Sequence, residues 1–255
     1  MDDLFSVDNA SRFLKQVALP SVPAMAGAEG QSIDFDRARQ QALLVGSDVL
    51  SFDTGVEAEF REAISDTALI AQLAATKQLG SNPDPIAYFD AYFSIVGNLG
   101  WATQVRDTAE YKLATDGAQV HEAIINVVTA FLGNAPGAMA LVELTLNSLK
   151  KMDQNSPFIT LFQRNSQNAQ LGRFQFTTVR PDPAGGLLAE VMAFALEAEE
   201  KITQVLFFKL QKGKSRMRRS LGSMSLNRVA MSALLPALRA KVAGHVVNNL
   251  ARLEI

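Results

Sequence analysis

The sequence predicts an α+β protein that is mostly helical, with N-terminal helices packed on an antiparallel meander of about four strands and with a C-terminal helix. Two changes of periodicity support this fold class. Apolar residues recur every three or four positions in the first part of the chain, alternate with polar residues from Pro157, and return to helical spacing near residue 226. A chain of 255 residues is long enough to bury a substantial core.

A loop rich in proline, glycine and alanine over 20–32 divides the chain into two units. We expect an N-terminal helical arm and loop over 1–33 and a single α+β domain over 34–255. Within that domain, the helical part covers 34–156, the strand block covers 157–219, and the C-terminal helix covers 226–251.

The arm begins with a short amphipathic helix over 6–19, followed by a loop rich in proline, glycine and alanine. Pro85 and Pro136 each suit the first position of a helix, where a missing N–H costs nothing. The helices expected after the arm are 34–46, 55–79, the aromatic helix that starts at Asp84-Pro85, 101–112, 117–132 and 136–151.

The strand block shows a period of two. Residues 158–162 predict a compact strand, and residues 173–177 alternate cleanly between polar and apolar. A Pro- and Gly-rich connection then leads into strands at 187–199 and 201–210, although 187–199 also fits a helix. In the last helix, Pro236 should cause a bend or a division.

Composition excludes several kinds of site. With no cysteine, the chain has no disulfide, thiolate nucleophile or zinc–thiolate centre, and its two histidines leave little imidazole for catalysis or for a metal, so we expect no metal site. The sequence contains no nucleophile elbow, zinc-protease helix or phosphate-binding loop. The glycine pair in 97–100 follows a helix instead of a strand, so we do not assign it to dinucleotide binding.

The formal charge of −2 conceals a strong asymmetry. Residues 209–255 carry +9, whereas residues 1–208 carry −11. The cationic run covers residues 209–219. If a strand continues through this run, alternate side chains share one face and could attract an anionic membrane or an acidic partner. Nucleic acid is a less favoured partner, because few aromatic residues are interleaved with the cations. The other interpretation is a charged loop or a protected edge strand. The candidate contact residues are Lys209, Lys212, Lys214, Arg216, Arg218 and Arg219.

Candidate catalytic residues are few. Glu197, Glu199 and Glu200 could supply a general acid and base, or oxygen ligands, and His121 could assist them. Because these glutamates precede a turn, a solvated strand end is the stronger interpretation.

Residues 84–104 form the most distinctive segment, with the single tryptophan and two of the three tyrosines of the chain. Tyr88 and Tyr92 lie in one helical row, and Phe89 and Phe93 in another. So much aromatic area indicates either a core centrepiece, which is the commoner case, or a surface for an apolar ligand.

Short motifs follow this segment in a fixed order to the end of the chain. They are Asp84-Pro85, Tyr88, Tyr92, Leu99-Gly100-Trp101, Gln104, ITLF at 159–162, GRFQ at 172–175, VLFF at 205–208 and LEI at 253–255. In this order the chain resembles the Evf-like virulence factor family (Erwinia virulence factor-like proteins) over roughly residues 60–255. The resemblance implies a mostly helical α+β fold, no recognised enzyme activity, and a fatty acyl chain attached through cysteine and held in an apolar pocket.

The absence of cysteine changes what this resemblance can imply, because no acyl thioester can form. Any fatty acid must therefore be bound non-covalently. The region that matches the acylated segment lies near 177–179. The candidate pocket residues are Tyr88, Phe89, Tyr92, Phe93, Trp101, Phe174, Phe176 and Val179.

The leading hypothesis is a non-enzymatic virulence or insect-toxin-like factor that binds lipid or associates peripherally with membranes. The alternative is an interaction module that binds nucleic acid or an acidic partner through 209–219, and the third hypothesis is an enzyme. The N-terminus begins with acidic residues, and no apolar run reaches the roughly 20 residues needed to cross a bilayer. We expect a soluble protein without a conventional secretion signal, cytoplasmic in the producing cell and then released or delivered to a host.

Overall fold

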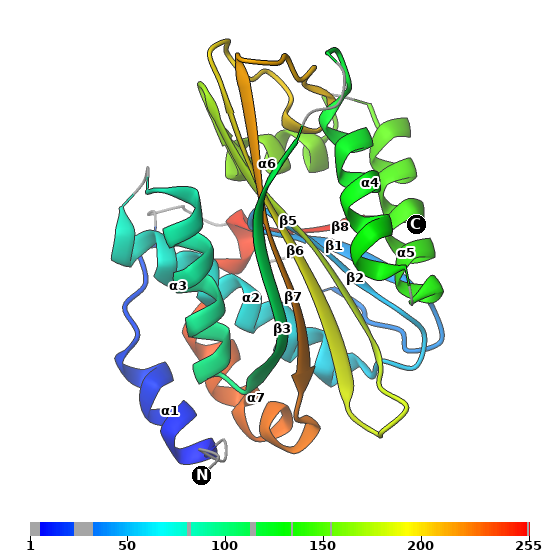
Figure 1. The fold of residues 1–255 in the computed structure, drawn as a ribbon. Helices are drawn as coiled ribbons and strands as arrows, with labels where there is room; N and C mark the ends of the chain where they lie inside the picture. The colour runs from blue at the N-terminus through cyan, green and yellow to red at the C-terminus, as the bar shows by residue number, and fades with distance from the viewer. Residues whose placement is uncertain are drawn as a thin grey trace.

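The computed structural model describes residues 6–22, 33–80, 83–112, 116–133, 135–153, 155–253 and 255. Across these ranges, helices cover both faces of one twisted sheet (Figure 1). The α+β class predicted from the sequence is confirmed.

The sheet has the strand order β3-β7-β6-β5-β2-β1-β8, and the short β4 pairs with β5 beside this path. Neighbouring strands are antiparallel except β2 and β5, which run parallel with Asp48 opposite Gln175. The strands are β1 (Gln41–Val45), β2 (Asp48–Phe52), β3 (Trp101–Tyr111), β4 (Gln167–Asn168), β5 (Leu171–Pro181), β6 (Leu187–Ala198), β7 (Ser215–Leu226) and β8 (Leu250–Leu253).

Side-chain caps and prolines set the start of several helices. Ser6, Ser156 and Asn227 each accept a hydrogen bond from a backbone N–H of the first turn, and Asp84 accepts two, from Ile86 and Ala87. The helices are α1 (Val7–Gln16), α2 (Ala58–Leu79), α3 (Pro85–Asn98), α4 (Val120–Leu132), α5 (Pro136–Lys151), α6 (Pro157–Ser166) and α7 (Arg228–Val242), with 3-10 turns η1 (Val205–Phe207) and η2 (Val246–Asn248).

The sheet separates two hydrophobic cores. Helices α1, α2, α3 and α7 contribute to one core, and α4, α5 and α6 contribute to the other. Because neighbouring residues of a strand point to opposite faces, Val191 and Ala193 of β6 enter the first core, whereas Met192 and Phe194 enter the second. The long helix α2 is buried between the sheet, α3 and α7.

The predicted helices at 55–79, at Asp84-Pro85, at 117–132 and at 136–151 are confirmed as α2 to α5, and the arm helix as α1. Two other predicted helices are wrong. Residues 34–46 contribute β1, which forms a hairpin with β2 through Gly46 at φ 61°. Both strands are buried on both faces, so their sequences show no alternation.

The predicted helix at 101–112 is also wrong, because this segment is the edge strand β3. Ala102 to Thr108 are exposed on both faces of the strand, and a strand without a buried face carries no period of two. Pairing with β7 along almost its whole length defines this strand.

Two predicted strands are corrected as well. Residues 158–162 lie in α6, which Ser156 caps and Pro157 starts, with Phe158, Ile159 and Phe162 facing the core. Residues 201–210 form η1 and irregular structure instead of a strand. The segment 187–199 is the strand β6, so its helical alternative is excluded.

The predicted C-terminal helix over 226–251 is too long. The helix continues through Pro236, ends at Val242, and is followed by η2 and the edge strand β8.

The predicted meander of about four strands is also too small. Strands β5, β6, β7 and β3 do form four antiparallel neighbours, but β3 comes from the part expected to be helical, and the described sheet contains eight strands. Over the described residues, none of the helices combines the length and apolar character that a bilayer span requires.

Candidate functional site

The aromatic residues of α3 face the sheet. Tyr88, Phe89, Tyr92 and Phe93 are each at most 4% exposed, and neighbouring rings meet edge to face at about 6 Å. Trp101 is buried at the start of β3. These aromatic side chains therefore lie in the core, which is the commoner of the two interpretations of this segment.

The eight candidate pocket residues do not meet around one space. Val179 joins Trp101 and the α3 aromatics in the first core, whereas Phe174 and Phe176 belong to the second core. The reason is the period of β5, in which residues 174 and 176 point away from the face that carries residue 179. Their predicted contact with a lipid stays a prediction.

A groove lies along the opposite face of the same helix. Its volume is about 760 Å³, and it runs between α1, the end of α2 and α3. The apolar lining comes from Phe13, Val17, Ala74, Leu79, Ala91 and Ile95. The polar lining includes Lys77, whose side chain is exposed, and Asp90, which pairs with Arg106 of β3.

Helix α1 forms one side of this groove because of its amphipathic sequence. Ala10 and Leu14 are buried against the rest of the molecule, and α1 packs on α7 and α3. Beyond α1 the chain reaches Gly244, where a Cβ would lie only 2.8 Å from Cγ2 of Val22. The Val22 side chain therefore lies directly against the backbone at Gly244, just after α7.

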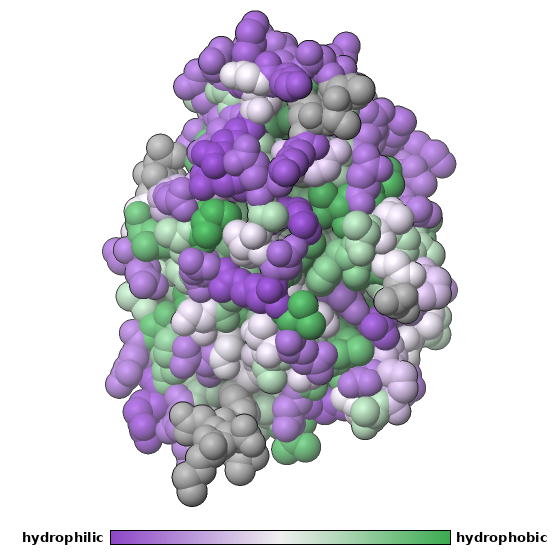
Figure 2. All heavy atoms as spheres, viewed as in Figure 1, coloured by the Kyte–Doolittle hydropathy of each residue, from purple (hydrophilic) through white to green (hydrophobic). Residues whose placement is uncertain are grey.

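The cationic run does not form one continuous ribbon. Lys209 precedes a turn, Lys212 and Lys214 lie within it, and β7 begins only at Ser215. This turn lies at the end of the molecule where hydrophilic residues gather in Figure 2. Strand alternation therefore does not place the lysines and the arginines on a common face, contrary to the sequence-based prediction.

The arginines of the run are paired with carboxylates. Arg216 contacts Glu110 at 2.7 Å, and Arg219 contacts Asp107 at 2.9 Å. Arg218 contacts both Asp84 and Glu197 at 2.9 Å. Among the described residues, no ion pair involves Lys209, Lys212 or Lys214, so these exposed lysines are the unpaired cations of the run there.

The candidate catalytic residues have separate environments. Glu197 is paired with Arg218 and lines an open depression together with Glu199, Glu110 and Arg216. His121 is buried in α4, with its ring 5.6 Å from that of Phe207. The histidine is not part of the depression, and no group of three or more potential metal ligands occurs in the described ranges.

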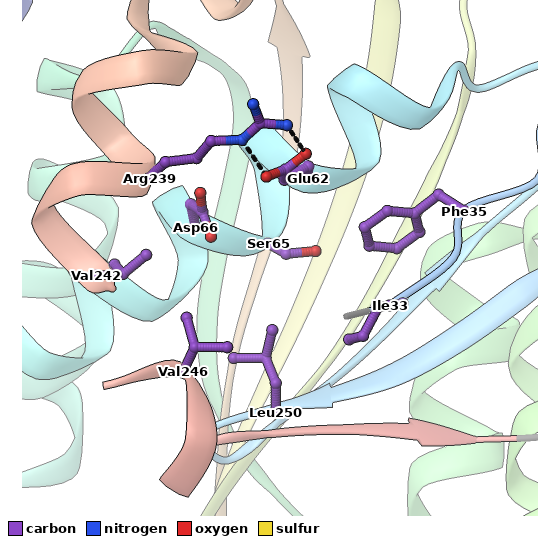
Figure 3. Close-up of a pocket in the computed structure, with 9 residues that line it drawn as sticks. All are labelled: Ile33, Phe35, Glu62, Ser65, Asp66, Arg239, Val242, Val246 and Leu250. Carbon is purple, nitrogen blue, oxygen red and sulfur yellow. Dashed lines mark hydrogen bonds and ion pairs between the residues drawn. The ribbon is translucent and has the colours of Figure 1, made fainter. Parts of the chain in front are cut away.

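Figure 3 shows a second cavity, of about 330 Å³, between α2, the end of α7 and the segment before β1. Its apolar lining comprises Ile33, Phe35, Val242, Val246 and Leu250, and its polar lining comprises Glu62, Ser65, Asp66 and Arg239. The Nε and Nη2 atoms of Arg239 both donate to the carboxylate of Glu62.

Asp66 is the unusual residue of this cavity. It is 5% exposed, and its Oδ2 atom is buried without a hydrogen-bond partner in the described part of the chain. Burial, and then the negative charge of Glu62, raise its pKa to about 7, while Arg239 opposes the shift. Asp66 is not among the site residues predicted from the sequence, although a carboxylate four positions after Glu62 inside an apolar helix is a signal that could identify it.

Comparisons with known proteins give weak likenesses. The chain matches no protein-family model and no curated protein sequence. A delta-endotoxin structure has 14% identity and a TM-score of 0.43, covering 81% of this chain and 91% of that one. The activated Cyt2Ba monomer from Bacillus thuringiensis subsp. israelensis has 13% identity and a TM-score of 0.39, covering 71% and 97%.

The Evf virulence factor structure is also similar, with 11% identity and a TM-score of 0.32, covering 80% of this chain and 81% of that one. The family is not established. Likenesses at this level carry no argument about function, and the Evf-like resemblance of the sequence stays a prediction.

Proposed function

We propose that this is a non-enzymatic lipid-binding protein that holds a fatty acid non-covalently in the groove between α1, α2 and α3. The observation that carries the proposal is the apolar lining of this groove by three helices, with Lys77 beside it. A virulence or insect-toxin-like role belongs to the same proposal, as the biological setting that the sequence resemblance implies.

The size and chemistry of the groove suit an acyl chain. Its volume of about 760 Å³ falls within the roughly 300–1,000 Å³ of small-molecule sites, which combine apolar linings with a few polar groups. Each methylene buried there contributes about 0.8 kcal/mol. The ammonium group of Lys77 can pair with the carboxylate of the fatty acid, which fixes the direction in which the chain lies.

Palmitate binding tests this proposal, measured by native mass spectrometry and calorimetry on the full chain. Ala91 lies in the groove on α3, so Ala91→Trp should fill the space and reduce palmitate affinity by about tenfold or more. Ala130 is exposed on α4, outside the groove, and Ala130→Trp is the matched control that should bind as the wild type does. The absence of palmitate binding, or equal binding by the two variants, would contradict the proposal.

A charge variant distinguishes the contribution of the fatty acid's carboxylate from that of its acyl chain. Lys77→Gln should weaken palmitate binding several-fold and leave binding of hexadecanol unchanged, because only the acid carries a charge. An equal loss for both ligands would contradict the role given to Lys77.

Peripheral contact with an anionic membrane is a second candidate function. It is favoured by Lys209, Lys212 and Lys214, which lie in or beside one exposed turn and have no ion-pair partner among the described residues. Juxtaposed lysines near a negative surface contribute about 1 kcal/mol each. Replacing all three with serine should abolish flotation with phosphatidylserine vesicles at low salt, whereas unchanged flotation, or flotation of neither protein, would reject this function.

A further inference from the structure

The cavity beside α2 combines an apolar interior with one carboxyl group that lacks a partner. The apolar side chains come from four separate segments, of which Phe35, Val242 and Leu250 represent three. A volume of about 330 Å³ is at the lower end of the range of small-molecule sites, which is roughly 300–1,000 Å³. The space therefore suits a small ligand and not a long lipid.

Three of the four polar side chains around this cavity, those of Glu62, Ser65 and Asp66, offer oxygen acceptors. Arg239 directs its Nε and Nη2 donors to Glu62, and the hydroxyl of Ser65 donates to the Arg61 carbonyl at 2.7 Å. Glu62, Ser65 and Asp66 still offer lone pairs on oxygen, whereas the N–H groups on Nη1 of Arg239 have no partner among these three residues. A ligand that satisfies these oxygens must bring hydrogen-bond donors.

The charges lead to the same conclusion. Glu62 and Asp66 contribute two carboxyl groups, and Arg239 neutralises the first of them. Burying an unpaired charge is costly, so a cation beside Asp66 would remove a penalty that the free protein carries. In Figure 3 the Asp66 carboxyl lies between the Arg239–Glu62 pair and the apolar side chains, where a short molecule could contact both.

We propose that this cavity is a binding site for a primary amine on a small apolar body, with the ammonium group on Asp66 and the apolar body against Phe35, Val246 and Leu250. The site does not depend on lipid binding in the groove, because the two share no lining residue.

The expected pH dependence follows from the groups that face Asp66. These are Glu62 on the same helix and Arg239 on α7, while His245, which precedes η2, has a pKa lowered by burial and is neutral at pH 7. Since the pKa of Asp66 is about 7 in the free protein, the carboxylate that an ammonium ion needs becomes scarce below that pH. Amine affinity should therefore fall as the pH is lowered from 8 to 6.

Calorimetry with 2-phenylethylamine tests the site at pH 8, with 2-phenylethanol and 3-phenylpropionate as neutral and anionic analogues. The amine should bind at least about tenfold more tightly than the alcohol, as expected for a charge-assisted hydrogen bond, and the acid should not bind. Equal affinity for amine and alcohol would overturn the proposal, as would the absence of amine binding up to about 10 mM.

Two variants test whether the ligand binds in this cavity. Asp66→Asn should reduce amine affinity by about tenfold or more and leave the weak binding of the alcohol unchanged. Val246→Phe fills the cavity without changing its charge and should weaken both ligands. Asp8→Asn, at an exposed position of α1, is the control and should bind as the wild type does. Wild-type amine affinity in Asp66→Asn, with thermal unfolding showing a folded protein, would exclude this site.

Discussion

Asp48 and Asp66 are two carboxyl groups that the fold removes from water. Burial raises the pKa of each to about 7. Asp48 is fully buried on β2, where Oδ2 accepts a hydrogen bond from the Thr177 hydroxyl at 2.7 Å and Oδ1 has no partner among the described residues. Asp66 lines a cavity, so a ligand can reach it, whereas Asp48 can only affect stability.

Asp48 should therefore make the protein less stable as the pH rises. Its pKa is higher in the folded state, about 7, than the ordinary value of 3.8, so the folded state binds more protons between these values and stability falls as the pH rises through that window. Ionised Asp48 costs on the order of 4 kcal/mol above pH 7. Asp48→Asn should keep the Thr177 hydrogen bond and remove this cost.

Urea unfolding at pH 5 and pH 8 measures the difference. The free energy of unfolding of Asp48→Asn should exceed that of the wild type at pH 8, and the two values should approach each other at pH 5. Asp8→Asn, which is exposed, should show no such change. A variant that is destabilised equally at both pH values would show that Asp48 is ionised in the folded protein.

At the scale of elements, the close packing of α3 on the sheet depends on Gly222 in the middle of β7. A Cβ at this position would lie 2.5 Å from Cε1 of Phe93. Phe93 is 4% exposed and packs against Tyr92, so its ring has little freedom to move away. Gly222 thus sets the distance between helix and strand.

Gly222→Ala should destabilise the protein by about 1–3 kcal/mol, the usual cost of overpacking a core. Phe93→Leu creates room at the same contact, and combining it with Gly222→Ala should recover part of the loss. Thermal unfolding of the wild type, both single variants and the double variant gives the four stabilities of a double-mutant cycle. Strictly additive effects would mean that the two residues do not constrain each other.

Elements with local signals were predictable from the sequence. Asp84 and Pro85 mark the start of α3 by capping chemistry. In β5 the alternation is between residue types and not between buried and exposed positions, since Phe174 and Phe176 enter the second core and the buried Thr177 donates to Asp48 on the other face. The sequence predicts helices at β1 and β3 for opposite reasons, since one strand is buried on both faces and the other is exposed on both. Neither situation leaves a period of two in the sequence.

The candidate sites were less predictable, because they depend on which helix faces meet. The sequence identifies α3 as a possible ligand surface, but packing on the sheet turns the aromatic face inward and leaves Ala91 and Ile95 for the groove. Asp66 becomes unusual only when α7 and the end of the chain enclose it. Both facts depend on contacts between residues that are far apart in the sequence.

For the molecule as a whole, one sheet contributes to both hydrophobic cores. Each residue of β6 that faces α2 is next to one that faces α5 and its neighbours, so loosening one core must disturb the strand that supports the other. Trp101 is the single tryptophan and lies in the first core. Its fluorescence therefore reports one face of the sheet, whereas far-ultraviolet circular dichroism reports helices on both faces.

This arrangement predicts that the two cores unfold together. Phe162 packs in the second core, and Phe162→Ala should destabilise the protein by about 3–5 kcal/mol. If the shared sheet couples the cores, Trp101 fluorescence in this variant should shift to lower urea by the same amount as circular dichroism, although the substitution is on the other side of the sheet. A fluorescence transition that stays at the wild-type midpoint would mean that α2, α3 and α7 form an independent unit. Coincident curves would establish that the sheet transmits the loss of packing from one core to the other.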